Sequence, residues 1–222
     1  MTPPFIIAID GTSASGKGTV ARKLAEKLSF AYLDTGLLYR AVGLAVLRQG
    51  GDPSNPLLAE QAALTLDPDK ATSLGDDDSL RSDAASVAAS KVAAIPAVRA
   101  ALLKFQQDFC AHPPGRVKGA VLDGRDIGTV IAPHAKVKIF ITASVETRAE
   151  RRFKELQKRG QTATYPSVLT DMVERDARDA ERSIAPTKPA PDAVVLDTTK
   201  LDAAQAFAEA ERIVNMTLAT SM

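Results

Sequence analysis

Short runs of apolar, often β-branched residues alternate with longer amphipathic segments along most of the chain. This alternation is typical of βα units, in which strands run parallel and helices cover both faces of the sheet. The apolar runs predict five strands, at residues 5–9, 30–33, 120–122, 137–142 and 193–196. We therefore expect the α/β fold class, with a five-stranded parallel sheet.

The longer segments predict helices at residues 17–28, 36–49, 82–94, 96–110, 144–159, 167–182 and 203–219. Ser82 and Ser144 stand where N-caps belong, Pro96 suits a first helical position, and Gly160 suits a C-terminal cap. The Ala-rich stretch at 84–101 indicates closely packed helix rather than low complexity.

Four of the predicted strands end on or just before a carboxylate, at Asp10, Asp34, Asp123 and Asp197. In open α/β sheets, ligands bind outside the carboxyl ends of the strands. We therefore expect the polar chemistry of the protein at that edge of the sheet.

Residues 50–80 break the pattern with Pro, Asn, Asp and Gly, and they include the acidic run Asp76, Asp77 and Asp78. We interpret this segment as a surface insertion between the second and third strands, because its composition does not predict a second core.

Composition narrows the class of protein. A chain of 222 residues with 45% hydrophobic and 25% charged residues fits one globular domain and excludes wholesale disorder, collagen-like repeats and coiled coil. The formal net charge of +1 gives no reason to expect nucleic-acid or membrane binding, so any anion site must be local.

Cys110 is the only cysteine, which excludes an intrachain disulfide and favours the reducing cytoplasm. The apolar stretch at residues 5–9 is too short for a signal segment or a membrane span.

The strongest motif is a glycine-rich loop between the first predicted strand and the first predicted helix. Glycines let backbone N–H groups curl around phosphate oxygens, and the N-terminus of the helix adds partial positive charge. Lys17 supplies an ammonium group for the β and γ phosphates. The loop residues expected to bind ATP are Gly11, Thr12, Ser13, Ala14, Ser15, Gly16, Lys17, Gly18 and Thr19.

Most loops of this kind place a Ser or Thr that ligates Mg²⁺ directly after the lysine, where this chain has Gly18. The hydroxyl of Thr19 comes one position later and points elsewhere on the helix. We therefore expect no direct protein ligand for the metal, with Asp123 able to hold it through water. A loop that ends in GKGT resembles those of the adenylate-kinase-like nucleoside monophosphate kinases rather than those of GTPases.

Two further stretches offer groups for a second phosphate. Arg40 lies one turn into the second predicted helix, from where its guanidinium could reach back to the sheet edge, although a solvated helix face would also hold it. Arg125 and Asp126 follow the third strand and offer one donor fork and one acceptor, and the alternative is a plain turn with salt-bridged neighbours.

Two helices are rich in basic residues. Arg175, Arg178, Asp179 and Arg182 share one face of the helix at 167–182, and the preceding helix carries Arg148, Arg151, Arg152 and Lys158. Phosphoryl transfer between two nucleotides gathers negative charge that arginines can neutralise, and a lid closing on the donor nucleotide would use the earlier helix. Taken alone, the helix at 167–182 is explained equally well by a solvated face, and the preceding helix by a C-terminus enriched in basic residues.

The segments IAIDGTSASGKGT, LDTGLLYRA, LDGRDIGT, VKIFITAS, RDARDAER and APTKPAPDAVVLDTT resemble the bacterial cytidylate kinase family, in the same order and at similar spacing. The resemblance covers nearly the whole chain. It implies transfer of the γ-phosphoryl group of ATP to CMP or dCMP, with Mg²⁺, on a P-loop core that carries a substrate-binding insertion and a lid. The corresponding parts are a core at about 1–35, 118–147 and 184–222, an acceptor region at about 36–117, and a lid with the arginine helices at about 148–183.

By the same resemblance, the residues that contact CMP are Thr35, Ser90, Arg99, Asp126, Arg175, Asp179 and Arg182. Arg40 and Arg125 suit the acceptor phosphate, and Arg152 is assigned to ATP. The residues assigned to catalysis are Lys17, Arg125, Asp126, Arg175 and Asp179. The amino group of cytosine needs an acceptor such as Asp126 or Ser90, and its O2 and N3 need donors such as Arg99 or Arg182, while Asp179 suits ribose hydroxyls. Without the resemblance, Ser90 and Arg99 would be read as surface residues.

The chain departs from the family pattern at two places. Thr35 stands where many members have Ser, which keeps the hydroxyl and adds a methyl group. Residues 65–80 are shorter and more acidic than the β-rich insert of the long bacterial enzymes.

We expect direct in-line transfer without a phosphoenzyme, because His112 and His134 lie in proline-flanked loops and Cys110 ends a helix. A general base is hardly needed, since the attacking phosphate oxygen is already ionised. The expected partners are ATP and CMP or dCMP, with no nucleic acid or membrane, for a monomer in the cytoplasm. One alternative is a kinase of the same core that acts on UMP, AMP or a hydroxy-acid. Another is a nucleotide-dependent switch, suggested by residues 199–202, which match the T-K-x-D pattern that reads guanine.

Overall fold

The computed structural model describes residues 3–67 and 77–220. Its five strands are β1 (Phe5–Gly11), β2 (Ala31–Asp34), β3 (Gly119–Gly124), β4 (Val137–Thr142) and β5 (Val194–Asp197). All pairings between them are parallel, and their order in the sheet is β2-β3-β1-β4-β5. Each predicted strand is confirmed, with bounds that differ by no more than two residues.

Seven helices match the predicted segments: α1 (Lys17–Leu28), α2 (Thr35–Arg48), α5 (Asp83–Val92), α6 (Pro96–Ala111), α7 (Val145–Lys158), α8 (Tyr165–Ala180) and α9 (Ala203–Thr220). The predicted caps are confirmed as well. Ser82 accepts a hydrogen bond from Ala85 N, and Ser144 accepts one from Thr147 N. Gly160 follows the end of α7 with a φ of 68°, which is the left-handed conformation that glycine favours.

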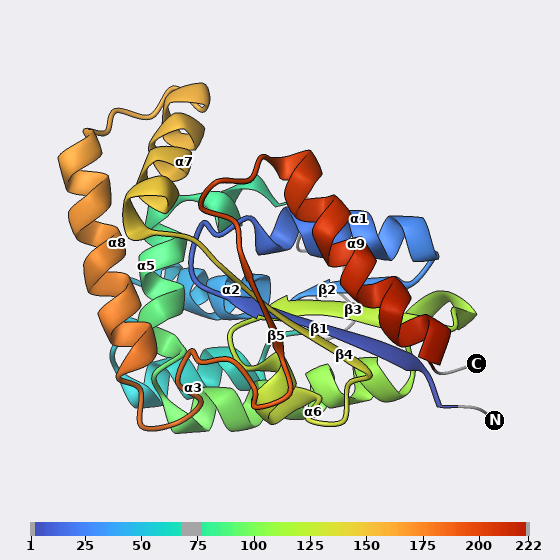
Figure 1. The fold of residues 1–222 in the computed structure, drawn as a ribbon. Coiled ribbons are helices and arrows are strands. Elements are labelled where there is room, and N and C mark those ends of the chain that lie inside the picture. Colours follow the sequence, from blue (N-terminus) through green and yellow to red (C-terminus); the bar gives the residue numbers. More distant parts are fainter. Residues whose placement is uncertain (1–2, 68–76, 221–222) are drawn as a thin grey trace.

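Helices cover both faces of the sheet, as the alternating strand pattern requires (Figure 1). On one face, Ile7 and Ile9 of β1 pack with α1 and α9. On the other face, Ala8 of the same strand packs with Phe109 of α6 and with the segment after β3. That segment is a short π-helix, η4 (Ile127–Ile131). Successive side chains of one strand thus contribute to two separate cores.

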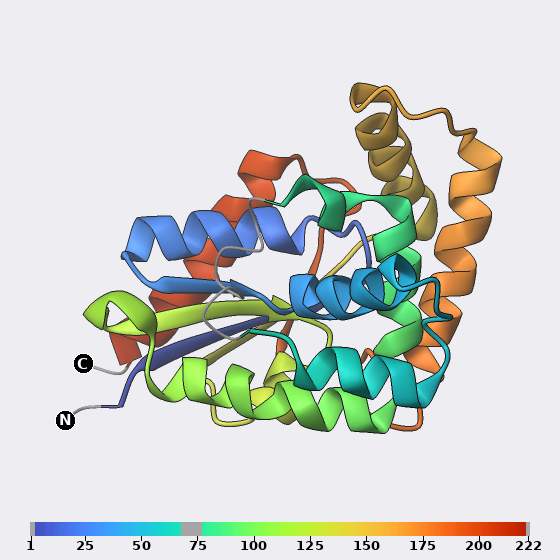
Figure 2. The same ribbon diagram turned by 180° about the vertical axis from the view of Figure 1, so that it is seen from behind.

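A further hydrophobic cluster lies among helices on the α6 side of the sheet, which faces the viewer in Figure 2. It is built from α2, α5, α6 and an additional helix, α3 (Pro56–Leu64). The interpretation of residues 50–80 as an insertion without a core is therefore wrong for α3, whose residues Ala59 and Ala63 are buried in this cluster. The start of α3 carries a signal in the sequence, since Asn55 caps it and Pro56 occupies its first turn.

The rest of the predicted insertion is described only in part. A 3-10 turn, η2 (Asp78–Arg81), precedes α5, and the side chain of Asp77 accepts a hydrogen bond from Ser79 N at its start. Residues 68–76, which include most of the segment that departs from the family pattern and the first residue of the acidic run, lie outside the described residues. A final 3-10 turn, η3 (Pro114–Arg116), leads from α6 into β3.

Helices α7 and α8 stand at the carboxyl end of the sheet, opposite the chain termini (Figure 1). They pack against each other through a small apolar cluster that includes Ala149, Leu156, Val168 and Met172. Within the described ranges, no single helix is both long and apolar enough to cross a membrane, and α5 passes such a test only jointly with residues 96–116, from which it is bent by 100°.

Helices α2 and α5 approach each other so closely that one position has no room for a side chain. A Cβ atom at Gly43 of α2 would lie 2.7 Å from Ala88 Cβ and 2.9 Å from the carbonyl carbon of the same residue. Real Cβ atoms do not come this close to backbone, so one helix would have to move.

We predict that Gly43→Ala lowers the free energy of unfolding by about 1–3 kcal/mol, because overpacking outweighs helix propensity at this position. Helix propensity alone would give the opposite sign, a gain of roughly 0.5–1 kcal/mol. Urea unfolding of the two proteins measures the difference. A stabilised variant would contradict the close contact between the two helices.

Candidate functional site

The ends of three neighbouring strands form the floor of the candidate site. In the register of the sheet, Asp34 of β2 pairs with Asp123 of β3, and Asp10 of β1 pairs with Gly124. The predicted concentration of carboxylates at the carboxyl edge is therefore confirmed for these strands. A cleft with a volume of about 440 Å³ opens above this edge, between the phosphate loop, α2, α5 and the two helices α7 and α8.

The phosphate loop connects β1 to α1 and exposes the N-terminus of the helix to the cleft. Ser13, Ala14, Lys17, Gly18 and Thr19 line the cleft. The remaining candidate loop residues, Gly11, Thr12, Ser15 and Gly16, shape the loop without lining the cleft.

Two glycines of the loop have a structural reason to be glycine. A Cβ atom at Gly11 would lie 2.0 Å from the carbonyl oxygen of Ile141, so no side chain fits there. Gly16 is the N-cap residue of α1, and its φ of 92° disfavours any side chain. No side chain among the described residues caps α1, which leaves its first N–H groups available to an anion.

Helix α7 and the segment after β5 hold the outer side of the loop. Arg148 donates to the carbonyl oxygen of Ser13 at 3.3 Å, and Arg151 donates to that of Ser15 at 3.4 Å. The hydroxyl of Thr198 also donates to Ser15 O, at 3.0 Å. Arg148, Arg151 and Thr198 do not line the cleft, so they hold these two carbonyl groups from outside it.

Lys17 lies among charges of both signs. Burial and the Arg125 guanidinium lower the pKa of Lys17 to about 8, while Asp123 and Asp34 act in the opposite direction. Its ammonium group is therefore only partly compensated by carboxylates, and binding of an anion there would favour the protonated form.

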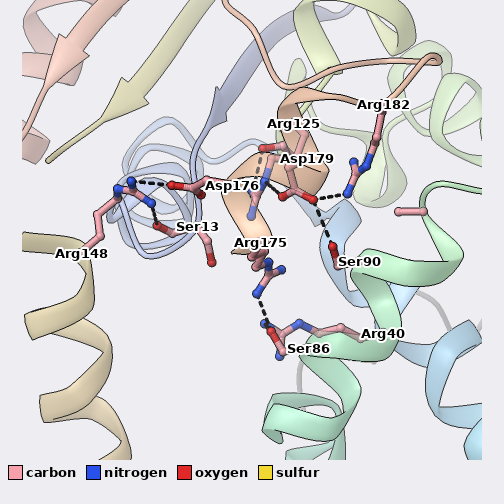
Figure 3. A network of polar contacts seen from close by, with 12 residues as sticks. Ser13, Arg40, Ser86, Ser90, Arg125, Arg148, Arg175, Asp176, Asp179 and Arg182 are labelled. Carbon is pink, nitrogen blue, oxygen red and sulfur yellow. Dashed lines mark hydrogen bonds and ion pairs between the residues drawn. The ribbon is translucent and has the colours of Figure 1, made fainter. Parts of the chain in front are cut away.

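Two buried carboxylates, Asp179 and Asp126, organise the part of the cleft next to α5 and α6. Asp179 of α8 accepts hydrogen bonds from Ser90 at 3.2 Å, from Arg125 Nε at 3.3 Å and from Arg182 (Figure 3). The two arginines hold the pKa of Asp179 below its ordinary value even though burial raises it.

Asp126, in the loop after β3, forms a buried ion pair with Arg99 of α6. The guanidinium of Arg99 also donates to Ala93 O at 3.0 Å and lies 5.5 Å from the ring centre of Tyr39. Arg99 is 8% exposed and Ser90 is 4% exposed, so both are buried in the site and neither is the surface residue that its helical pattern alone suggested.

Arg40 and Arg175 are among the guanidinium groups of the cleft that form no ion pair with a carboxylate in the described part of the chain. Arg40 donates to Leu80 O at 2.8 Å and to Ser86 Oγ at 3.4 Å, and Arg175 donates to the same hydroxyl at 2.5 Å (Figure 3). Burial and the Arg125 guanidinium lower the pKa of Arg175 to about 9, and burial also lowers the pKa of Arg40. Two positive groups that converge on one neutral hydroxyl form a site for an anion.

Every candidate CMP-binding residue lines this one cleft, as do Lys17 and Arg152. Thr35 lies beneath the acceptor side, where its hydroxyl donates to Asp123 O at 2.8 Å. Arg152 forms ion pairs with Asp83 and, at 2.9 Å, with Glu155. Cationic groups outnumber carboxylates in the lining: the first set is Lys17, Arg22, Arg40, Arg81, Arg99, Arg125, Arg152, Arg159, Arg175 and Arg182, and the second is Asp34, Asp123, Asp126, Glu155 and Asp179.

Some expected groupings are wrong. Arg178 does not join the face formed by Arg175 and Asp179, because it turns outward to pair with Glu174 at 3.7 Å on the surface. Lys158 is exposed and does not line the cleft. Asp202, the last residue of the T-K-x-D match, caps α9 by accepting from Ala204 N and Gln205 N at 2.8 Å. A structural role thus accounts for the residue on which the guanine-reading alternative depended.

Several lining residues were not predicted. Ser86 lies four residues before Ser90 on α5, so the helical period already puts both on one face. Tyr39 directly precedes Arg40 and carries no local signal for a site.

Asp10 does not line the cleft, and it accepts hydrogen bonds from Ile127 N at 2.7 Å and from Gly128 N at 2.8 Å. It therefore holds the turn that follows Arg125 and Asp126.

The family model for cytidylate kinase matches residues 7–216. The chain is 62% identical over 209 residues to a cytidylate kinase of Paramagnetospirillum magneticum, covering 94% of this chain and 97% of the relative. It is 59% identical over 206 residues to a cytidylate kinase of Rhodospirillum rubrum, covering 93% and 95% of the two chains. A solved structure of a sugar kinase from Janibacter sp. aligns with a TM-score of 0.51 at 13% identity, covering 96% of this chain and 95% of that chain, which supports the shared fold.

We predict that the stability of the protein has a component that increases as the pH falls through about 6, owing to Asp10. Burial raises the pKa of Asp10 from 3.8 to about 6, although the two backbone hydrogen bonds oppose this shift. Between these two pKa values the folded state binds a proton that the unfolded state does not, so the cost of the buried charge is present above about pH 6 and is relieved below it.

Urea unfolding of the wild type and of Asp10→Asn tests this component. From about pH 7.5 to about pH 5, the wild type should gain on the order of 1 kcal/mol relative to the variant, which has no group to protonate there. The difference between the two proteins cancels the titration of the other carboxylates. Parallel pH profiles would contradict the prediction.

Proposed function

The chain belongs to the cytidylate kinase family, and we propose that it transfers the γ-phosphoryl group of ATP to CMP and dCMP, forming CDP and dCDP. The observation that carries this proposal is that one cleft holds two sets of positive donor groups, each of which would bind a phosphate. One is the phosphate loop with Lys17, and the other is formed by Arg40 and Arg175 at Ser86. A nucleotide kinase that transfers between two phosphate groups requires both.

On the donor side, the N–H groups at the start of α1 and the Lys17 ammonium would bind the β and γ phosphates of ATP. Arg152 would bind the same nucleotide by exchanging its partners Asp83 and Glu155 for phosphate oxygens. This assignment is supported by the position of Arg152 in the lining of the cleft.

On the acceptor side, Arg40, Arg125 and Arg175 would bind the phosphate of CMP. Asp126 would accept from the amino group of cytosine, with Arg99 and Arg182 as donors to O2 and N3, and Ser90 as a further partner. Thr35 lies close beneath these groups, and Asp179 would bind ribose hydroxyls while it orients Arg125 and Arg182.

The chemistry we propose is direct, in-line attack of a phosphate oxygen of CMP on the γ-phosphorus of ATP. That oxygen is ionised at neutral pH, so no general base is needed. Lys17, Arg125 and Arg175 would stabilise the charge of the transferring group, and Asp126 and Asp179 would hold the acceptor in line.

The residues at the floor of the cleft fit a Mg²⁺ ion held through water. The buried Oδ1 atom of Asp123 has no partner among the residues described, and a Cβ atom at Gly18 would lie 2.9 Å from its Oδ2 atom. Burial and the neighbouring Asp34 carboxylate raise the pKa of Asp123, which a divalent cation would reverse. When bound, the ion would neutralise the β and γ phosphates, with Asp123 and Asp34 orienting its waters.

We further propose that the enzyme acts as a monomer in the cytoplasm, with the core, acceptor region and lid divided as the resemblance implies. A cleft whose donor and acceptor groups all come from one chain supports the first point. The single cysteine, Cys110, supports a reducing compartment.

The first prediction from this proposal concerns the acceptor. With ATP and Mg²⁺, the purified protein should form ADP with CMP and dCMP at a kcat/KM at least roughly 10-fold above that with UMP, AMP, GMP or shikimate, because the proposed donors and acceptors would pair with the polar atoms of cytosine. A coupled assay of ADP formation measures each rate. No acceptor-dependent ADP from any of these compounds would overturn the proposal.

The second prediction concerns Asp126. Asp126→Asn should lower kcat/KM for CMP by about 100-fold while KM for ATP stays within about twofold, because the carboxylate faces only the acceptor. Asp108→Asn is the matched control, since Asp108 lies on α6 with Arg99 but forms an exposed ion pair with Lys104 at 2.6 Å, and such pairs contribute little. The thermal midpoint of each variant checks the fold. Unchanged kinetics with CMP would remove Asp126 from the acceptor site.

A further inference from the structure

Helix α8 carries two carboxylates whose contacts lie on opposite sides of the site. Asp179 contacts Ser90, Arg125 and Arg182 on the acceptor side. Asp176, one turn earlier, contacts Arg148 of α7 at 2.6 Å (Figure 3). Asp176 does not line the cleft and is assigned to neither ATP nor CMP.

Arg148 uses all three of its guanidinium nitrogens for structural contacts. Nε donates to Ala143 O at 2.8 Å, at the end of β4, and Nη1 donates to Ser13 O of the phosphate loop at 3.3 Å. Nη2 pairs with Asp176. The planar fork of a guanidinium fixes these three directions relative to one another, so Asp176 determines how the whole group is oriented.

The pair is partly shielded from water, because its Arg148 side is buried. Arg148 is 4% exposed, and the side chain of Asp176 is 26% exposed. By contrast, the pair of Glu174 and Arg178 on the same helix spans 3.7 Å with side chains 63% and 44% exposed. A buried guanidinium left without its counter-charge is costly, whereas an exposed pair contributes little.

Through this pair, a change in the phosphate loop can reach the acceptor side. Ser13 O connects to Arg148, Arg148 connects to Asp176, and Asp176 lies on the same helix as Arg175 and Asp179, which line the cleft. Because α8 is a continuous helix from Tyr165 to Ala180, a displacement at Asp176 moves both of those residues with it.

We propose that Asp176 is a positioning residue that couples the two nucleotide sites, so that a nucleotide on the phosphate loop raises the affinity of the acceptor site. By linkage, CMP raises the affinity for ATP by the same factor. The inference rests on the proposed function, since it assumes that ATP and CMP occupy these two sites. Asp176 acts through Arg148 and contacts neither nucleotide.

The test measures the Kd of CMP by calorimetry on the full chain, with and without a saturating non-hydrolysable ATP analogue and Mg²⁺. In the wild type, the analogue should tighten CMP binding by about 5-fold or more, a typical coupling between sites. In Asp176→Asn the ratio should fall toward 1, while the Kd of CMP alone changes by less than about twofold. Asp176→Glu restores the carboxylate and should recover part of the ratio. Glu174→Gln, on the same helix, should behave as the wild type.

A double-mutant cycle tests whether the coupling passes through the contact between Arg148 and Asp176. Arg148→Lys keeps the charge but cannot reach three partners at once, so it should also lower the ratio. The variant that combines Arg148→Lys with Asp176→Asn should lose no more than either single variant, because both act through one contact. Thermal unfolding of each variant confirms that the chain is folded.

The inference is overturned if the wild type shows no coupling, or if Asp176→Asn keeps the wild-type ratio. It is also overturned if Asp176→Asn weakens CMP binding equally with and without the analogue, since Asp176 would then belong to the acceptor site itself. Steady-state turnover separates this result from failure of the proposed function. If the wild type phosphorylates CMP, but the ATP analogue does not change the Kd of CMP in the wild type or in Asp176→Asn, the proposed function holds and only the inference fails.

Discussion

Repulsion between the positive side chains of the cleft is the constraint around which the structure is arranged. Burial removes much of the screening that water provides, and it lowers the pKa of Lys17, Arg40, Arg175 and Arg182. An arginine keeps its proton in proteins, so the cost is carried by the fold rather than relieved by deprotonation. The carboxylate of Asp179 offsets part of this electrostatic cost. The remaining excess of positive charge at Arg40 and Arg175 is what nucleotide phosphates would neutralise.

Such a charge cluster keeps its geometry only on a rigid frame. The parallel sheet supplies it, because the register of β1, β2 and β3 fixes where the phosphate loop, α2 and the loop of Arg125 begin. Hydrogen bonds between these segments make the frame more rigid. Thr35 donates to Asp123 O, and Asp10 accepts from Ile127 N and Gly128 N. These side chains are buried, and their hydrogen bonds persist without competition from water.

The parts of this frame that have local signals could be predicted from the sequence. The five strands, the caps at Ser82 and Ser144, and the phosphate loop follow from periodicity and turn chemistry. Helix α3 was missed because it is short and largely apolar, so it shows no amphipathic period, although Asn55 and Pro56 mark its start. Ser90 and Arg99 came only from the family resemblance, since their burial results from how α5 and α6 pack. The outward turn of Arg178 could not be read from spacing, because i, i+3 neighbours lie on one face only approximately.

Helices α7 and α8 make apolar contacts with each other and polar contacts with α5 and the turn before it. Between themselves the two helices share an apolar cluster, which costs free energy to expose. Toward the acceptor region their contacts are polar: Arg152 with Asp83, Arg159 with Arg81 O, Arg175 with Ser86 and Asp179 with Ser90. Polar partners can be exchanged for water or for phosphate at small net cost. The apolar contact between α7 and α8 therefore costs more free energy to break than their polar contacts with α5 and the turn before it.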